Sequence, residues 1–538
     1  MSVFTHIAIH CTAKYVAKVS PGVTALLCEG LLNRLQSVPH EGRESVGLTK
    51  RDLRSHWAKD PDLRLALLTA LNEKQRVQTT FPQQARVFST PEKQALQTFA
   101  GVFRDFYAPA AKTPFIMLAG KGAWEVSTHG GVFLSVGGYG KDAFGHNPEA
   151  LQAVMGHPHV IANIMTPHWS QIELKHRVAD ELGLGSGQFD IQMLNSGSEA
   201  MELGLQYVER LIKERVGSGA DQVATPQWVI NLEGSFHGRT SRPAGLSNST
   251  KAAYERTLTP RSSAYDVHSV PANDVAALER VYDQAREQGA HVAAVVMEMV
   301  QGEGDPGRAI TAEFYQRARA LTEQEDGLLL VDSVQSGWRT YGCLSPLSAP
   351  AFDGCQRPDI EVFSKALTGG IYPGSMLVLN ARASRLYEVG TYGNTMTGNA
   401  KAAEMAIAVF NEMTPEVRAN MHARSQQFMT AFEGLQTKYP ALISGVQGTG
   451  LLLALKIADV TDEAGVTRTV VPVVGPNGLE RQLRQQGLNI IHGGKDNYLR
   501  LTPNFKITEA QVVLVVQLLD RVFAEVAKRL HAPPGLDN

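Results

Sequence analysis

Two charged residues, Lys365 and Asp332, stand where each could hold part of the same ligand. Lys365 is followed by small residues and glycines in the segment 364–370, and Asp332 ends the apolar run 328–331, 33 residues earlier. An amine in such a segment can form a Schiff base with an aldehyde, and a carboxylate at the end of a buried strand can pair with a pyridine nitrogen. A lysine beside glycines can also be a solvated loop residue. Together the two groups predict a site for pyridoxal 5'-phosphate (PLP).

Neighbouring motifs could hold the rest of this cofactor. The segment NSGSEA at 195–200 follows an apolar strand and opens a helix, where free N–H groups favour an anion. The alternative is an ordinary capping box of Ser196 with Glu199. Phe236 follows the predicted strand 228–232 and could stack on a flat ring or simply fill the core. Gln335 could bond to an oxygen of the cofactor.

Two arginines could bind carboxylates. Arg500 is flanked by leucines in a predicted strand, where an unpaired charge is costly, so a carboxylate partner is expected. Arg239 could bind a carboxylate with its two-pronged guanidinium, although a surface ion pair is the alternative. Glu298 and Glu303 follow the strand 292–296, and such strand-end acids are commonly solvated loop charges.

The composition predicts a globular protein of two to four domains. The 538 residues carry 51 basic and 53 acidic side chains, a balance that does not indicate a nucleic-acid or membrane partner. The cysteines form no zinc-binding pattern, so we expect no metal and a reduced cytoplasmic location. Predicted strands at 228–232, 292–297 and 328–331 alternate with amphipathic stretches such as 311–323, which favours an α/β domain with a mostly parallel central sheet.

The two ends of the chain differ from this centre. Residues 1–110 contain helix-like stretches at 23–35, 61–71 and 91–107 and no chemical motif. A helix is expected from residue 400, after a glycine-rich stretch at 390–398. Beyond it we expect a strand at 448–456, a helix at 479–486, a strand at 498–501 and a final helix at 508–530. The predicted divisions are a helical extension (1–110), a cofactor domain (111–420) whose first segment contributes to the small domain, and a small C-terminal α+β domain (421–538).

At this point the chain resembles the class III PLP-dependent aminotransferases of the ornithine, acetylornithine and lysine type. The resemblance covers roughly residues 115–530, and its motifs occur in the family's order. They are GHNP at 145–148, NSGSEA at 195–200, FHGRT at 236–240, VQGEG at 300–304, DSVQSG at 332–337, SKALTGG at 364–370, TMTGN at 395–399 and LRLTP at 499–503. The resemblance implies the fold type I architecture and a homodimer with shared active sites.

It also implies a role for each matching residue. Lys365 would carry the Schiff base and Asp332 would pair with the pyridine nitrogen. The other cofactor contacts would be Gly197, Ser198, Phe236, His237, Gln335 and, in the neighbouring subunit, Thr395. The substrate contacts would be Tyr139, Arg239, Glu303 and Arg500, with Glu303 holding Arg500 aside while the amine reacts.

These residues imply transfer of the distal amine of an ornithine-, acetylornithine- or lysine-like amino acid to 2-oxoglutarate, in a ping-pong sequence. A racemase or aminomutase could use the same PLP site, and a non-catalytic regulatory subunit is a more remote alternative. Several positions depart from the family's pattern: Ser333 replaces the usual glutamate after Asp332, Met299 and Ala400 replace common prolines, and the segment after Gln335 is one residue shorter.

Overall fold

The computed structural model describes residues 21–36, 46–99, 102–104, 106, 112–216, 225–258, 263–461, 465–490 and 497–530. Residues 1–20, part of the predicted N-terminal extension, lie outside this description. Within these ranges no helix is long and apolar enough to cross a membrane.

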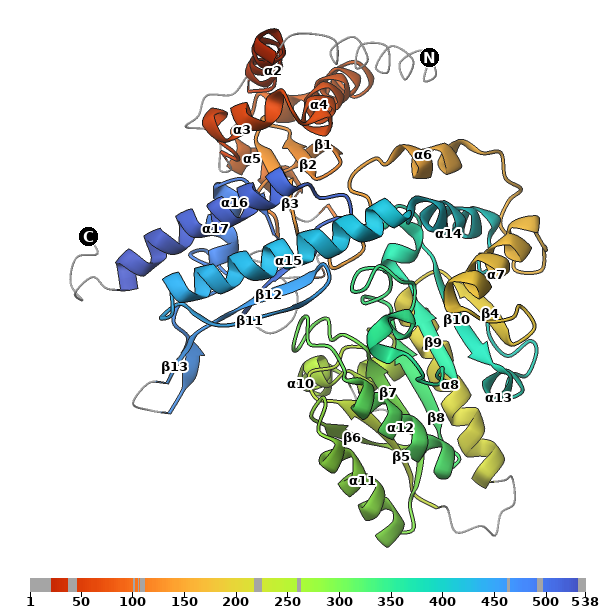
Figure 1. Cartoon of the computed structure of the whole chain (residues 1–538). Coiled ribbons are helices and arrows are strands. Elements are labelled where there is room, and N and C mark those ends of the chain that lie inside the picture. The colour runs from red at the N-terminus through yellow and green to blue at the C-terminus, as the bar shows by residue number, and fades with distance from the viewer. Residues whose placement is uncertain are drawn as a thin grey trace.

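A seven-stranded sheet forms the centre of the larger part of the molecule (Figure 1). Its order is β4-β10-β9-β8-β7-β5-β6. Strand β10 runs antiparallel to β4 and β9, and every neighbouring pair from β9 to β6 is parallel. The predicted α/β class with a mostly parallel central sheet is therefore confirmed. The strands are β4 (Phe189–Leu194), β5 (Gln227–Leu232), β6 (Asp266–Val270), β7 (His291–Glu298), β8 (Leu328–Asp332), β9 (Ile360–Phe363) and β10 (Ser375–Asn380).

The central apolar runs become strands because helices cover both faces of the sheet. Leu330 packs with residues of α8 (Gly197–Val216) in the core on one face, and its neighbour Val331 packs with residues of α12 (Ala312–Gln324) on the other. Every residue of β8 is buried, as expected for a parallel strand between two helical layers. The other helices along this part of the chain are α6 (Glu149–Gly156), α7 (Trp169–Leu182), α9 (Ser241–Leu246), α10 (Lys251–Thr257), α11 (Val275–Glu287), α13 (Ala381–Ser384) and α14 (Ala400–Glu412).

The C-terminal residues build a smaller α+β part. Strands β11 (Ile443–Thr449), β12 (Leu452–Ile457) and β16 (Tyr498–Leu501) form one sheet. The single strand expected at 448–456 is wrong: the chain turns at Gly450, whose φ of +58° favours glycine. The helices of this part are α15 (Pro415–Lys438), which was not predicted, and α16 (Leu479–Gln485) and α17 (Glu509–Leu530), which lie close to the predicted positions.

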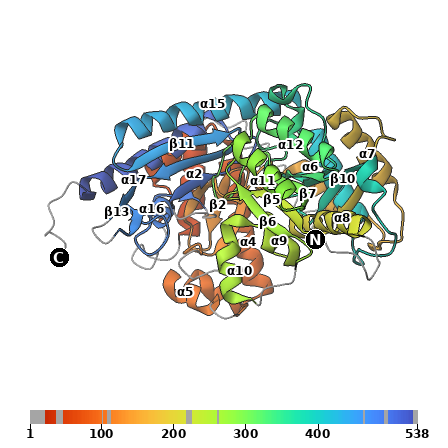
Figure 2. The same ribbon diagram turned by 90° about the horizontal axis from the view of Figure 1, so that it is seen from below.

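The first strands of the chain join the smaller part. Strands β1 (Met117–Lys121), β2 (Trp124–Ser127) and β3 (Val132–Ser135) form a sheet that β15 (Leu488–Asn489) extends in parallel with β3. A short hairpin, β13 (Asp459–Thr461) and β14 (Thr467–Thr469), projects from the same end. Both views place β11 and α17 toward one end of the molecule and α7 with β10 at the other (Figure 1, Figure 2). The divisions at residues 110 and 420 stay predictions.

The N-terminal extension is helical where the structure describes it. Its helices are α2 (Pro21–Leu35), α3 (Lys50–Trp57), α4 (Pro61–Thr80) and α5 (Glu92–Phe99). Helix α2 matches the predicted stretch 23–35, and α4 begins as predicted at residue 61 but continues to Thr80, beyond the expected end at 71. Helix α3 was not predicted. Helix α5 ends at Phe99, whereas its expected end at residue 107 lies outside the described residues.

Asp60 fastens these helices to the body of the protein. Its carboxylate caps α4 and also accepts hydrogen bonds from Trp124 Nε1 at 2.8 Å and Gln511 Nε2 at 2.8 Å. A second link is the ion pair of Arg521 with Asp52 at 2.9 Å. We call these five residues the N-terminal joint. It connects the extension to strand β2 and helix α17.

Candidate active site

Residues from several strand ends line one cavity at the carboxyl edge of the central sheet. The cavity has a volume of about 170 Å³. Parallel strands present their carboxyl ends at the same edge, so side chains far apart in the sequence meet there. Of the residues expected to contact the cofactor, those that line it are Gly197, Ser198, Phe236, His237, Asp332, Gln335 and Lys365.

Asp332 and Glu298 are the two acidic residues that line this cavity. They end the adjacent strands β8 and β7 and are paired in register. Asp332 Oδ2 lies 2.9 Å from Nδ1 of His237, whose ring is buried and whose Nε2 has no hydrogen-bond partner among the described residues. The ring thereby orients the Asp332 carboxylate.

Glu298 also lines the cavity, although it was not among the predicted site residues. Its carboxylate is buried and accepts hydrogen bonds from the backbone N–H groups of Phe236 and Gly302, each at 3.0 Å. Burial raises its pKa to about 7; His237 lowers this pKa and Asp332 raises it. The expectation of a solvated loop charge is wrong for Glu298. The sequence signal that could have identified Glu298 is its position at the end of a predicted strand, as Asp332 is at the end of the next one.

Lys365 follows β9 and faces these acids. It begins a short 3₁₀ turn with a φ of +50°, a left-handed conformation that few residues other than glycine adopt. Burial lowers the pKa of its ammonium group; Glu303 and Asp332 raise this pKa, and Arg500 lowers it. The amine is therefore closer to its neutral form than an exposed lysine would be.

The opposite end of the cavity is the N-terminus of α8. Ser196 Oγ accepts from Glu199 N–H at 3.3 Å, so the capping interpretation of this motif is correct. Gly197 and Ser198 nevertheless line the cavity as well. A Cβ on Gly197 would lie 2.8 Å from Val334 Cγ1, and one on Gly238 would lie 2.7 Å from Ser198 Oγ. These glycines allow the backbone to approach closely and leave room for an anion beside the helix N-terminus.

Gln335 is held between two backbone segments. Its Nε2 donates to the carbonyl of Tyr139 at 2.8 Å, which leaves its Oε1 as an acceptor beside Gly302. A Cβ on Gly302 would lie 1.7 Å from that oxygen, so a larger residue there would displace the amide.

Arg500, Glu303 and Tyr139 form a second group. Arg500 Nη1 lies 3.0 Å from Glu303 Oε1 and also donates to the carbonyl of Gly302. The guanidinium lies 5.5 Å from the centre of the Tyr139 ring. Arg500 is buried, and its Nη2 has no hydrogen-bond partner within the described ranges. This leaves one side of the guanidinium available for a further acceptor.

Two further predicted residues, Arg239 and Thr395, lie outside both the cavity lining and this second group. Arg239 is exposed, and its guanidinium lies 5.4 Å from the centre of the Phe236 ring, which itself lines the cavity. Thr395 is exposed, in the segment between α13 and α14, and its carbonyl accepts from Ile164 N at 3.0 Å. Within a single chain, Thr395 is not part of the cavity.

Ser333, a departure from the family's pattern, points away from this site. Its Oγ donates to the buried Glu361 carboxylate at 2.7 Å, and burial raises the pKa of Glu361. A glutamate at position 333 would put a second carboxylate beside Glu361 in the protein interior. The serine therefore fits its own surroundings and leaves the Asp332 side chain unchanged.

A lysine with a desolvated amine, a strand-end aspartate and a helix N-terminus that line one cavity at a sheet edge are typical of a PLP-dependent enzyme of the aminotransferase fold. The sequence profile described as aminotransferase class-III matches residues 107–523, and the chain belongs to this family. It is 31% identical over 435 residues to the acetylornithine/succinyldiaminopimelate aminotransferase of Yersinia pestis, covering 80% of this chain and 97% of that protein. It is 29% identical to the acetylornithine aminotransferase of Parasynechococcus marenigrum, covering 77% and 92% of the two chains.

Solved structures show the same fold. The ornithine aminotransferase of Toxoplasma gondii superposes with a TM-score of 0.67 at 21% identity, over 81% of this chain and 96% of that one. The acetylornithine aminotransferase of Elizabethkingia anophelis gives a TM-score of 0.62 at 22% identity, over 81% and 100%. The protein is thus a transaminase that depends on PLP, as sequence motifs and fold together predict.

The residues of the cavity fit this cofactor. They offer an amine for its aldehyde, a carboxylate for its ring nitrogen and a helix N-terminus for its phosphate. The buried His237 Nε2, which lacks a partner among the described residues, also indicates that polar groups here are arranged toward a ligand.

Proposed function

We propose that this aminotransferase moves the distal amino group of an ornithine-, N-acetylornithine- or lysine-like amino acid to 2-oxoglutarate. The observation that carries the proposal is the Arg500–Glu303 ion pair at 3.0 Å, beside Lys365. While Glu303 is paired with Arg500, this arginine cannot bind a carboxylate next to the reacting carbon. The ion pair therefore favours reaction at the distal amine of the donor. When Glu303 swings away, Arg500 can bind the carboxylate of the oxo acid.

The cofactor would be held by residues at both ends of the cavity. Gly197 and Ser198 would bind its phosphate, Phe236 would stack on its ring, and Gln335 would contact a ring oxygen. Asp332, oriented by His237, would keep a proton on the ring nitrogen. PLP supplies an electron-withdrawing ring that stabilises negative charge at the carbon from which a proton is removed.

Lys365 would move that proton. Its Nζ has a lowered pKa because it is buried, so a neutral amine is available to take the proton from the amine-bearing carbon and return it nearby. The same enclosure excludes water from the proton transfer.

The end of the donor that carries its α-carboxylate would contact residues outside the cavity lining. We assign its α-carboxylate to Tyr139 and Arg239, since Arg239 lies against Phe236 and Tyr139 lies beside Arg500. The relatives named acetylornithine aminotransferase support a donor of this length and charge.

We further propose a homodimer in a reduced, cytoplasmic compartment. Exposed apolar side chains lie on two segments that touch through the Ile164–Thr395 hydrogen bond. They include Ile161, Met165 and Val389, with exposed fractions of 93%, 83% and 91%. A surface of this kind favours burial against a second copy, which would bring Thr395 toward the partner's phosphate site. Sedimentation should give twice the chain mass, and Met165→Asp should shift it toward the monomer.

The donor is tested by a half-reaction. L-Ornithine, N-acetylornithine, L-lysine and 4-aminobutyrate are added one at a time to the holoenzyme without oxo acid, and the cofactor absorbance is followed. We expect one of the first three to bleach the yellow form, and 2-oxoglutarate to restore it. Turnover of an amino acid without any oxo acid would instead indicate a racemase or aminomutase.

A further inference from the structure

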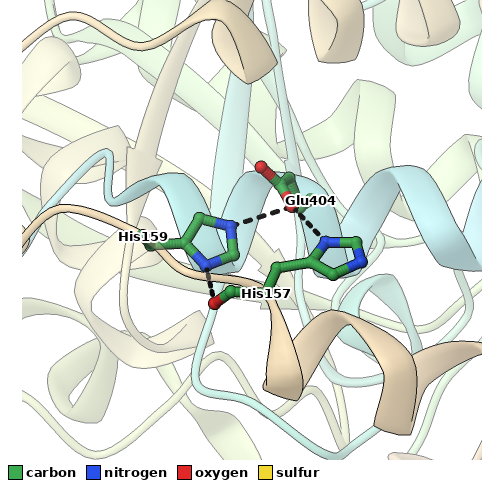
Figure 3. A group of neighbouring side chains, drawn as sticks. All are labelled: His157, His159 and Glu404. Atoms are coloured by element: carbon green, nitrogen blue, oxygen red, sulfur yellow. Dashed lines mark hydrogen bonds and ion pairs between the residues drawn. The ribbon is translucent and has the colours of Figure 1, made fainter.

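A second group of chemically active side chains lies outside the cavity, where the connection between α6 and α7 meets helix α14 (Figure 3). His157 Nδ1 lies 3.0 Å and His159 Nε2 lies 2.8 Å from the same oxygen, Oε2 of Glu404. Among the described residues this is the group of His, Cys, Asp and Glu side chains that lies close enough together to hold a metal ion.

The backbone aims both histidines at Glu404. His157 ends α6 in an extended conformation, with φ −66° and ψ 136°, as expected for a residue before proline. In extended chain, residues two apart point to the same side. The spacing His157-Pro158-His159 therefore presents two imidazoles to one carboxylate, which α14 supplies.

The hydrogen bonds of His159 leave its second nitrogen as a ligand. Nδ1 lies 2.9 Å from the carbonyl oxygen of His157, which can only accept, so Nδ1 carries the proton. In the neutral ring, Nε2 then bears a lone pair that faces the Glu404 carboxylate, and this nitrogen makes no well-directed hydrogen bond within the described ranges. Two acceptors at this distance need a positive charge between them, either a proton on Nε2 or a metal ion that displaces it. A backbone carbonyl on the other nitrogen is also how metal-binding histidines are commonly oriented.

We propose that His157 Nδ1, His159 Nε2 and Glu404 Oε2 bind one divalent transition-metal ion, of which zinc is the representative. Two imidazoles and a carboxylate suit zinc, with water in the fourth position. The ligand atoms lie within 4.8 Å of one another. Around a tetrahedral ion they would be about 3.3 to 3.5 Å apart, so a small outward movement of His157, whose side chain is 56% exposed, admits the ion.

The surrounding charges are compatible with this assignment. Glu404 supplies the one acidic side chain of the group, beside the two imidazoles. His168 lies near, with its ring centre 6.1 Å from that of His159, but its Nδ1 caps α7. The site therefore has three protein ligands.

A bound ion would brace the α6–α7 connection against α14. That connection carries Ile161 and Met165, and α14 follows directly after the segment containing Thr395. The proposed role is structural and separate from the chemistry at Lys365. Metal binding would be linked to the stability of this face.

Zinc binding to the holoenzyme tests the proposal. The protein is freed of metal with a chelator, titrated with ZnCl₂ by calorimetry, and titrated with Co²⁺ while visible absorption is recorded away from the cofactor band. We expect one ion per chain, a Co²⁺ spectrum of low-symmetry nitrogen and oxygen coordination, and a zinc-dependent rise in melting temperature.

Variants separate this site from adventitious binding. His157→Ala, at an exposed position that the fold tolerates, and Glu404→Gln should each weaken zinc binding at least about 10-fold and abolish the rise in melting temperature. His176→Ala, an exposed histidine on α7, is the matched control and should change neither. Unchanged zinc affinity in His157→Ala and Glu404→Gln, or no zinc retained by the wild type, would overturn the proposal.

Discussion

The PLP cavity and the N-terminal joint both contain polar side chains brought together by tertiary structure, but the hydrogen bonding of those side chains differs between the two regions. In the joint, Asp60 accepts from Trp124, Gln511 and the first turn of α4. In the cavity, His237 Nε2 has no hydrogen-bond partner among the described residues, and the same holds for Arg500 Nη2 in the second group. The joint satisfies its polar groups internally, whereas the cavity keeps groups available for ligands.

This difference separates stability from activity. Buried polar groups without partners destabilise the folded chain until a ligand supplies the partner, so removing one changes activity far more than folding. Removing a satisfied group leaves its former partners exposed or orphaned, which lowers stability without touching the chemistry. Variants in the cavity should therefore lose activity and keep stability, whereas variants in the joint should lose stability and keep activity.

The largest expected effect is at Lys365. Lys365→Ala should lower transamination by at least about 10⁴-fold, because the covalent anchor and the proton carrier are both lost. Without cofactor, its melting temperature should equal or exceed that of the wild type, since a desolvated ammonium is removed. Steady-state rates and thermal melts check this, with exposed Lys251→Ala as control. Appreciable residual transamination would contradict the assignment.

Arg500 should show a smaller effect confined to one half-reaction. Arg500→Lys keeps the charge but loses the paired hydrogen bonds, so KM for 2-oxoglutarate should rise by about 10- to 100-fold. The rate of the amine half-reaction should change much less, because in that half-reaction Glu303, and not a substrate carboxylate, is paired with residue 500. Stopped-flow absorbance resolves the two steps, with Arg308→Lys, at an exposed arginine, as control. Equal losses in both half-reactions would mean that Arg500 is structural.

The pH dependence of stability should reveal Glu298. Its pKa is raised from 4.5 to about 7 in the folded chain, so the folded state keeps a proton that the unfolded chain releases. Without cofactor, the free energy of unfolding should therefore fall as pH rises from about 4.5 to about 7, by on the order of 3 kcal/mol. Glu298→Gln should flatten this part of the profile. Identical profiles for the variant and the wild type would mean that Glu298 does not titrate there.

The smallest effect is expected at the joint. Asp60→Ala removes a helix cap and orphans Trp124 Nε1, so stability should fall by about 2 kcal/mol. Transamination below the melting temperature should stay within about twofold of the wild type, because variants far from the chemistry leave it intact. Thermal melts and rate assays check this against Lys59→Ala, an exposed neighbour. A loss of activity without a loss of stability would erase the contrast between the two regions.

The sequence predicts the central sheet and most of the cavity because the signals are local. Apolar runs such as 328–331 predict buried strands, and polar residues at their ends predict a site at the sheet edge. Seven expected cofactor residues line the cavity for this reason. The hairpin at 443–457 is missed because its first strand carries no apolar run and only Gly450 and Leu451 separate it from the second, so the pattern predicts one strand across the left-handed turn at Gly450.

By itself, the sequence predicts the candidate chemical groups of this protein: the lysine, the strand-end aspartate, the helix start proposed to bind phosphate, and the arginine and glutamate lie in motifs that can be read along the chain. Tertiary structure alone decides what lies opposite each of them. It buries Glu298 beside Asp332, ties the N-terminal helices to the body through Asp60, and brings Glu404 to His157 and His159. These contacts join residues that are tens to hundreds of positions apart, and only the packing of helices and strands sets those distances.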